Sequence, residues 1–126
     1  MDINDLSYKI IGCAYNVYNK LGPGLLESIY EKALMREFQK ADIKAVNQQK
    51  IDVKYDGEPL GLDLRLDIVV EDTIILELKS VEKILPVHLK QLFTYLKLTD
   101  KRLGLLINFN VDNIAKEGIH RIVNKL

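Results

Sequence analysis

The chain contains little of what marks secreted, membrane-spanning or fibrous proteins. Its 126 residues include one cysteine, Cys13, so no disulfide can form within it, and two histidines, too few for a Cys/His zinc site. No apolar run approaches the roughly 18 residues that a membrane span needs. The first residues, Met1 to Asp5, lack the basic start of a signal peptide. These absences predict a small cytoplasmic protein in a reducing compartment, with no membrane contact.

The sequence also lacks an excess of either charge, because 18 Lys and Arg residues balance 18 Asp and Glu residues. The molecule as a whole therefore does not attract nucleic acid, and such binding would need a local basic face. Neutrality mildly favours self-association, so a homodimer is one possible state. No repeat, low-complexity tract or Gly/Ser/Pro-rich linker divides the chain, which predicts a single domain over residues 1–126.

The spacing of apolar residues predicts two helices, then strands. The first helix has apolar residues at helical spacing from Leu6 to Leu21, after Asn4 or Asp5 as its cap, and Gly22-Pro23-Gly24 ends it. The second has an apolar face from Leu26 to Phe38 that includes Ile29. The later elements are a strand from about 45, a hairpin turn at Asp56-Gly57, a return strand over about 60–70, a strand at 74–79, a helix opened by Pro86 with Phe93 on its apolar side, a strand at 102–109 and a weak last strand near 119–123.

This order, α-α-β-β-β-α-β(-β), predicts an α/β fold with a mixed β-sheet flanked by helices. The strands at 74–79 and 102–109 should be parallel neighbours, because a helix crossover joins them. Both are apolar at nearly every position, so we expect helices to cover the sheet there on both faces.

Charged residues interrupt these buried strands at three positions. Glu77 and Lys79 lie two residues apart and so on the same face of one strand, and Asp67 interrupts the preceding strand. If the hairpin between the strands is centred on Asp72, Asp67 lies directly across from Glu77. A slip of one residue would send the two carboxyl groups to opposite faces.

Two opposed carboxylates are destabilising, and burial raises their pKa values unless a cation compensates. Lys79 supplies one positive charge, and a divalent cation such as Mg²⁺, which binds one or two carboxylates plus waters and phosphate, would supply the rest. The other interpretation is structural: an isolated acid at the rim of a sheet is ordinary surface charge, and ion pairs also shift pKa values.

Asp67 followed by Glu77-Leu78-Lys79 resembles the signature of the PD-(D/E)xK nuclease superfamily, whose restriction-endonuclease-like core has the order α-β-β-β-α-β. The segment Gly24-Leu25-Leu26-Glu27-Ser28-Ile29-Tyr30 matches the Gly-x-x-Glu-x-x-Tyr string of the GxxExxY family within it. Residues 21–28, 86–92 with Tyr95-Leu96, and 103–109 also look like that family. One departure is Leu66, which replaces the proline of the signature and carries no ligand.

The resemblance implies metal-dependent hydrolysis of a phosphodiester in nucleic acid, with DNA as the expected polymer and Mg²⁺ or Mn²⁺ as the cofactor. Asp67, Glu77 and the backbone carbonyl of Leu78 would bind the metal, and Lys79 would be the catalytic lysine. Glu27 would be an accessory acid and metal ligand, and Gln91 a helix glutamine that faces the site. The secondary candidates are Tyr30, His88 and Tyr95.

Several of these residues also have ordinary interpretations. His88, Gln91 and Tyr95 form a polar stripe on the third helix that either borders the acids or faces solvent. Glu27 also suits the first turn of a helix through the helix dipole, and Tyr30 also suits a core with a bonded hydroxyl. Basic residues gather in sequence around the third helix, as phosphate contacts or as ordinary solubilising groups: Lys83, His88, Lys90, Lys97, Lys101 and Arg102.

Two other functions stay open. One is a non-catalytic interaction or regulatory module on the nuclease fold, which would be a dimer; retention of Asp67, Glu77 and Lys79 together favours the enzyme instead. The other is hydrolysis of a nucleotide phosphate ester, which would need a closed pocket, and the sequence has no glycine-rich phosphate loop.

Overall fold

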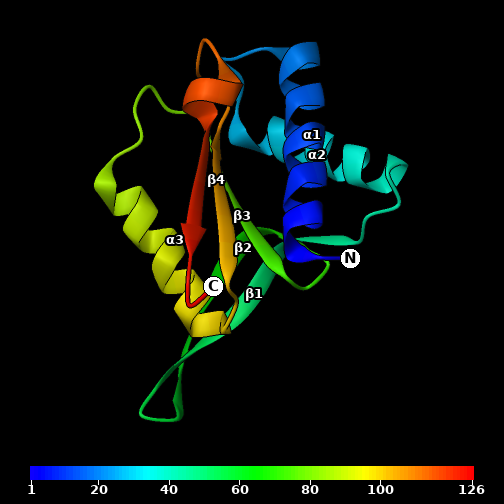
Figure 1. Cartoon of the computed structure of the whole chain (residues 1–126). Helices are drawn as coiled ribbons and strands as arrows, with labels where there is room; N and C mark the ends of the chain where they lie inside the picture. Colours follow the sequence, from blue (N-terminus) through cyan, green and yellow to red (C-terminus); the bar gives the residue numbers. More distant parts are fainter.

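Five strands form one mixed sheet in the order β1-β2-β3-β4-β5 in the computed structural model, which describes residues 1–126. Strands β3 and β4 are parallel, as predicted, and all other neighbours are antiparallel. Helices α1 and α2 cover one face of the sheet and α3 covers the other (Figure 1). The elements are α1 (Ile3–Leu21), α2 (Glu27–Lys40), β1 (Ala45–Tyr55), β2 (Glu58–Val70), β3 (Ile74–Lys79), α3 (Pro86–Thr99), β4 (Leu103–Asn108), a π-helical turn η1 (Ile114–Gly118) and β5 (Ile119–Val123).

The predicted α/β architecture and element order are therefore confirmed, including the last strand. The turn η1 has no counterpart in the prediction. None of the helices is both long and apolar enough to cross a membrane.

Local chemistry sets the ends of α1. Its N-cap is Asp2, whose side chain accepts a hydrogen bond from the backbone N–H of Asn4 at 2.7 Å, so the predicted cap at Asn4 or Asp5 is wrong by two or three residues. The helix ends as predicted at Gly22, which has a φ of 71° and donates its N–H to the carbonyl of Tyr18 at 2.7 Å.

Two hydrophobic cores lie on opposite faces of the sheet. The larger one joins α1 and α2 to the even-numbered side chains of β3 and the odd-numbered side chains of β4. The smaller one, under α3, contains Leu66, Val69, Ile75, Leu92, Leu96 and Leu106.

Four residues of the predicted apolar helix faces are exposed instead: Leu21, Leu26, Ile29 and Phe93. The buried line of α2 runs through Tyr30, Leu34 and Phe38, at spacings of four, so Leu26 and Ile29 fall outside it. Helix α3 turns Leu92 and Leu96 inward. Phe93 is left on the surface, with the ammonium of Lys97 5.7 Å from the centre of its ring.

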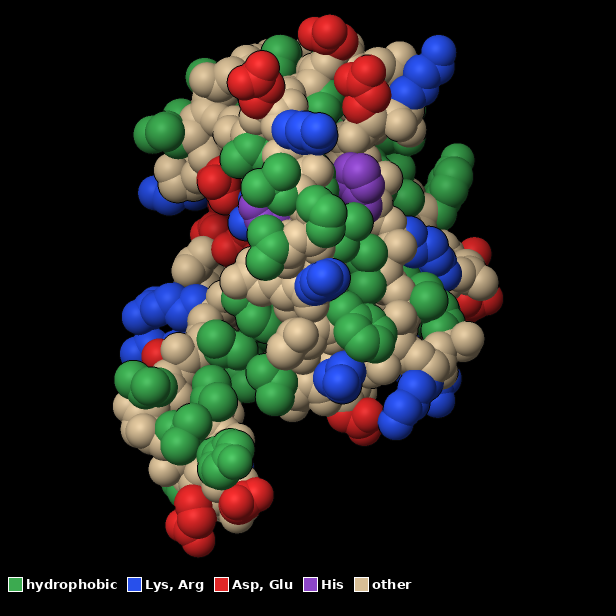
Figure 2. Space-filling model, turned by 90° about the vertical axis from the view of Figure 1, so that its left-hand side faces the viewer, with side chains coloured by type: hydrophobic (Ala, Val, Ile, Leu, Met, Phe, Trp, Pro, Cys, Tyr) green, Lys and Arg blue, Asp and Glu red, His purple; other side chains and the backbone are tan.

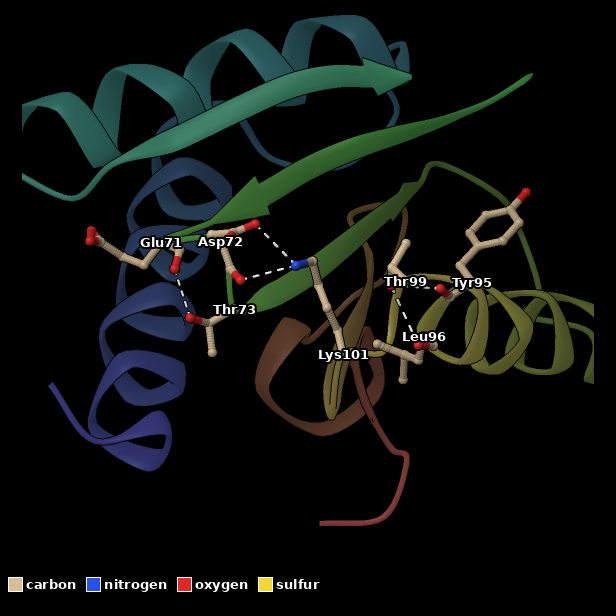
Figure 3. Close-up of polar contacts among 7 residues, drawn as sticks. All are labelled: Glu71, Asp72, Thr73, Tyr95, Leu96, Thr99 and Lys101. Atoms are coloured by element: carbon tan, nitrogen blue, oxygen red, sulfur yellow. Dashed lines mark hydrogen bonds and ion pairs between the residues drawn. The ribbon is translucent and has the colours of Figure 1, made fainter. Parts of the chain in front are cut away.

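The turn between β2 and β3 fixes the register on which the site depends. Glu71 and Asp72 both have a φ of 51°, as a type I′ hairpin turn requires, and the N–H of Thr73 donates to the carbonyl of Val70 at 2.9 Å. Lys101 ties the turn to the end of α3 through hydrogen bonds to the Asp72 carbonyl at 3.0 Å and carboxylate at 3.1 Å (Figure 3). Ile68 consequently pairs with Leu76, which is the register predicted from a turn centred on Asp72.

The hairpin of β1 and β2 continues beyond the rest of the sheet as an arm, which we define as residues 52–63. It extends from the body in both views (Figures 1 and 2). The total accessible surface is 7827 Å², against about 6,900 Å² for a compact chain of this mass. Every residue of the arm except half-buried Val53 is exposed, so the arm lacks a covering layer.

Candidate active site

Strands β2 and β3 separate at Asp67, and two carboxyl groups occupy the point of separation. The last paired residues are Ile68 and Leu76. Beyond them Asp67 Oδ2 accepts a hydrogen bond from the N–H of Leu78 at 2.8 Å, and the N–H of Asp67 donates to Glu77 Oε1 at 3.4 Å. Hydrogen bonds from side chains to the backbone therefore replace the backbone pairs between β2 and β3 here. They bring the two acids together.

On its other edge Asp67 lies opposite an irregular residue of β1. The ladder pairs Asn47 with Ile68 and Gln49 with Leu66 but leaves out Gln48, which has a φ of 53°. A left-handed conformation is uncommon for glutamine and interrupts regular strand pairing. The backbone of Asp67 is thus released from regular pairing on both sides, where its carboxyl group meets Glu77.

A third acid approaches from α2. Glu31 accepts hydrogen bonds from Gln48 Nε2 at 2.7 Å and Asn47 Nδ2 at 3.1 Å, and its charge acts on Asp67. No cation pairs with Glu31. Two carboxamides of β1 therefore hold a negative charge on the α2 side of the carboxyl pair.

The pair is electrostatically strained. Burial, and then the charge of Asp67, raise the pKa of Glu77 to about 8, and only 9% of this residue is exposed. Burial also raises the pKa of Asp67; the charge of Glu31 adds to the shift, while the Leu78 N–H and the charge of Lys79 oppose it. Both acids favour the protonated form more than free carboxyl groups do, so a cation is needed to hold both of them ionised at neutral pH.

Lys79 and two residues of α3 complete the surroundings of the pair. Lys79 is half-buried, and its charge favours the ionised form of both acids. Burial and then the charge of Glu77 raise the pKa of the Tyr95 hydroxyl, against a hydrogen bond with Gln91. The side chains of Gln91 and Tyr95 thus lie together on the α3 side of the carboxyl pair, and the Tyr95 ring points away from the β2–β3 turn (Figure 3).

His88 has a structural role at the start of α3. The imidazole Nδ1 of His88 accepts a hydrogen bond from the backbone N–H of Leu85 at 3.0 Å. The backbone N–H of His88 donates to the Leu85 carbonyl at 3.0 Å. This reciprocal pair caps the helix at the residue before Pro86. The imidazole nitrogen that faces the backbone is therefore occupied.

Tyr30 holds the loop that leads into α2. Its ring is buried and stacks on Phe109 with centroids 4.2 Å apart and an angle of 7° between the planes. Its hydroxyl donates to the carbonyl of Gly22 at 2.6 Å and accepts the N–H of Leu25 at 3.1 Å. Ser80, just after β3, donates to the Leu25 carbonyl, so the start of α2 is fixed to the end of β3.

Glu27 is the first residue of α2 and is exposed, with no hydrogen bond or ion pair. The α2 acid whose charge reaches Asp67 is Glu31, which the sequence reasoning missed. A signal for it existed, because residues four apart share a helix face, so Glu31 follows Glu27 toward the sheet. Gln48 and Asn47 were missed without such a signal, since nothing in their sequence context indicates a left-handed residue.

The donor set suits Mg²⁺ or Mn²⁺. The chain brings no three Asp, Glu, His or Cys side chains together in metal-binding geometry, whereas Mg²⁺ typically takes one or two carboxylates with waters and phosphate oxygens. The N–H of Phe109 donates to the Lys79 carbonyl at 3.0 Å, so the backbone of Lys79 faces β4 and that of Leu78 faces the gap beside β2. The Leu78 carbonyl thus lies on the side of the two carboxyl groups.

A comparison with curated proteins found no match, and neither did a comparison with solved structures. A comparison with family models matched residues 4–122 to the PD-(D/E)XK nuclease superfamily. This range includes the whole sheet except Val123, the three long helices except Ile3, and every candidate site residue. The restriction-endonuclease-like arrangement of a mixed sheet between helices agrees with the match. The chain belongs to the PD-(D/E)XK nuclease superfamily.

Proposed function

We propose that this protein is a metal-dependent nuclease that hydrolyses phosphodiester bonds, with DNA as the substrate. The observation that carries the proposal is the meeting of a half-buried carboxyl group, Asp67, with a buried one, Glu77, beside Lys79 where β2 separates from β3. A fold gains nothing from two opposed acids at this depth. A cation-binding reaction site accounts for them, and superfamily membership indicates nuclease activity.

Asp67 and Glu77 would hold Mg²⁺ or Mn²⁺ together with the backbone carbonyl of Leu78. When bound, such an ion polarises a phosphoryl oxygen and lowers the pKa of its water. In the structure the N–H of Leu78 holds one oxygen of Asp67, which fixes the direction of the carboxylate. The rigid strand β3 supplies Glu77, Leu78 and Lys79 in sequence, so their relative positions are set by the strand itself.

Lys79 would orient the attacking water and neutralise the charge that develops on the phosphate oxygens. Gln91 and Tyr95 would contact the water or the nucleic-acid backbone from α3, since both lie on its side of the carboxyl pair. Glu27 would act as an accessory acid at the start of α2. The assignment to the GxxExxY family, which rests on Gly24 to Tyr30, stays a prediction.

The test is a cleavage assay on labelled single- and double-stranded DNA and RNA with Mg²⁺, Mn²⁺ or EDTA. We expect metal-dependent cutting that K79A abolishes, while the matched variant K83A, which removes an exposed lysine four residues later, cuts like the wild type. Cutting that persists in EDTA, or that survives K79A in a folded protein, would refute the proposal. The cleaved polymer would identify the substrate.

A second candidate function is a non-catalytic interaction module, which would act as a homodimer. The observation that favours it is the arm, because one face of it is apolar and uncovered, with Tyr55, Leu60 and Leu62 exposed. A folded wild-type protein that cuts none of the substrates with any metal would favour this candidate over the nuclease.

A further inference from the structure

A cavity of about 570 Å³ lies between α2 and the start of β1, on the side of the fold opposite α3. Three cationic side chains line it: Lys32 and Arg36 from α2, and Lys44 from the loop before β1. Gln39 and Asn47 add carboxamides, and no Asp or Glu is among the lining residues. In a chain with equal numbers of acidic and basic residues, this is a local separation of charge.

We call this cavity the basic groove. Its three cationic side chains have no ion-pair partners. The ion pairs of the fold join Lys20 and Lys40 to Glu37, and Lys101 to Asp72. The backbone N–H of Lys44 donates to the side chain of Glu71 at 3.1 Å, but its ammonium group forms no such bond. The ammonium and guanidinium donors are thus available to an anion.

A chain of contacts through Asn47 and Glu31 links the groove to the candidate active site. Asn47 lines the groove and donates to Glu31, and the charge of Glu31 acts on Asp67. Along α2 the distance from Glu31 to Gln39 is about 12 Å at 1.5 Å per residue. One strand of duplex DNA presents three or four phosphates over roughly that length, at about 3.4 Å each.

We propose that this groove binds the phosphate backbone of the nucleic acid whose scissile bond lies at Asp67 and Glu77. The proposal rests on the proposed function for its substrate class. Phosphates would contact Lys32, Arg36 and Lys44 in turn, and the carboxamides of Gln39 and Asn47 would donate to backbone oxygens. The strand would then leave the groove past Asn47 toward the carboxyl pair.

The basic residues around α3 are a weaker alternative for the same role. On that side of the molecule Lys and Arg side chains lie singly among hydrophobic ones (Figure 2). Lys97 lies over the ring of Phe93, and Lys101 is bound to Asp72. The α3 set nevertheless supplies a control of equal charge.

The experiment measures binding of fluorescently labelled duplex and single-stranded DNA by anisotropy, in EDTA so that no cleavage occurs. The groove variant K32E/R36E/K44E is compared with the control K90E/K97E/R102E, which changes the net charge by the same amount. Thermal unfolding verifies that both variants are folded. The variant K32R/K44R keeps the charge of the groove and tests whether charge alone is enough for binding. We expect the groove variant to bind at least about tenfold more weakly than the control. Its salt slope on duplex DNA should fall by about 2.7 from the loss of three phosphate contacts.

Equal weakening in both triple variants, or a wild-type protein that binds no nucleic acid, would overturn the groove assignment. So would displacement of the polymer by millimolar thymidine monophosphate, because the groove would then be a nucleotide pocket. Failure of the proposed function appears in a different measurement. If DNA binds through the groove but metal-dependent cleavage is absent or survives K79A, the groove assignment stands and the nuclease assignment fails.

Discussion

The centre of the sheet and the arm use the same kinds of residue in opposite surroundings. Leu76, in β3, is fully buried between helices on both faces, whereas Leu62, in the arm, is 70% exposed. Each region also places two acids opposite each other: Asp67 near Glu77 in the centre, and Asp52 paired with Asp63 in the arm. Strand-forming residues thus build strands in both places, but only the centre has layers to cover them.

The two acid pairs show what burial changes. In the arm Asp52 and Asp63 are exposed, and water screens their repulsion. In the centre burial removes that screening and raises the pKa of Glu77 to about 8. A buried acid pair is therefore a costly arrangement that indicates function, while a solvated pair indicates only a surface.

The largest difference should appear in catalysis. D67A and E77A each remove a carboxylate of the proposed metal site, and we expect cleavage to fall by about 10³-fold or more. D52A and D63A remove acids of the arm and should leave the cleavage rate within about twofold of the wild type. Initial rates on a labelled duplex in Mg²⁺ measure both. Comparable losses from the two pairs would show that the buried pair has no special role.

Stability should differ next. L76A empties a fully buried position and should lower the free energy of unfolding by about 2–5 kcal/mol. L62A removes an exposed side chain and should change it by no more than about 0.5 kcal/mol. Urea denaturation at several protein concentrations measures both values. A larger, concentration-dependent effect of L62A would show that the arm is covered by a second copy.

The pH dependence of stability should reveal Glu77. Its folded pKa of about 8 lies above the ordinary value of 4.5, so between these values the folded state binds more protons than the unfolded one. The contribution of Glu77 to stability is therefore greatest below this window and falls as the pH rises through it, by up to about 1.4 kcal/mol per pH unit. In E77Q the fall should be much flatter, and in D63N unchanged. Urea denaturation from pH 5 to 8.5 tests this, and an unaltered slope in E77Q would contradict it.

A divalent cation should give the smallest effect. At a concentration ten times its Kd, Mg²⁺ should stabilise the folded protein by about 1.4 kcal/mol at pH 8, where Glu77 is more readily ionised. D67N should lose this gain, while D52N in the arm should keep it. Thermal unfolding in Mg²⁺ and in EDTA measures the shift. Equal stabilisation of D67N would place the ion elsewhere.

Most of the fold could be predicted from the spacing of apolar residues and from the turn residues in the sequence. The register of β2 and β3 follows from the turn at Asp72, and it brings Asp67 to Glu77. The covered centre follows from strands that are apolar on both faces. These features are local in sequence or depend on one turn, so alternation and spacing are enough to find them.

Part of the surroundings of the site depends on contacts between residues far apart in the sequence. Gln48 takes a left-handed conformation that glutamine seldom adopts, and Glu31 gains its position from the amides of β1. His88 looks like a site residue in the sequence but caps its own helix. Contacts across the fold thus place Gln48 and Glu31, whereas His88 is held by a local bond to Leu85.

The arm and the site share β2, and this has a mechanical consequence. From Leu62 to Val70 the strand has no residue with positive φ, so Asp67 and Leu62 lie on one extended segment. The last three residues of β2, Ile68 to Val70, pair with both β1 and β3, and Asp67 directly precedes them. Leu62 lies about 17 Å from Asp67 at about 3.4 Å per residue. A displacement of Leu62 would therefore move the backbone that carries the Asp67 carboxylate. A partner that binds the arm would therefore also shift the position of Asp67, the acid proposed to bind the metal.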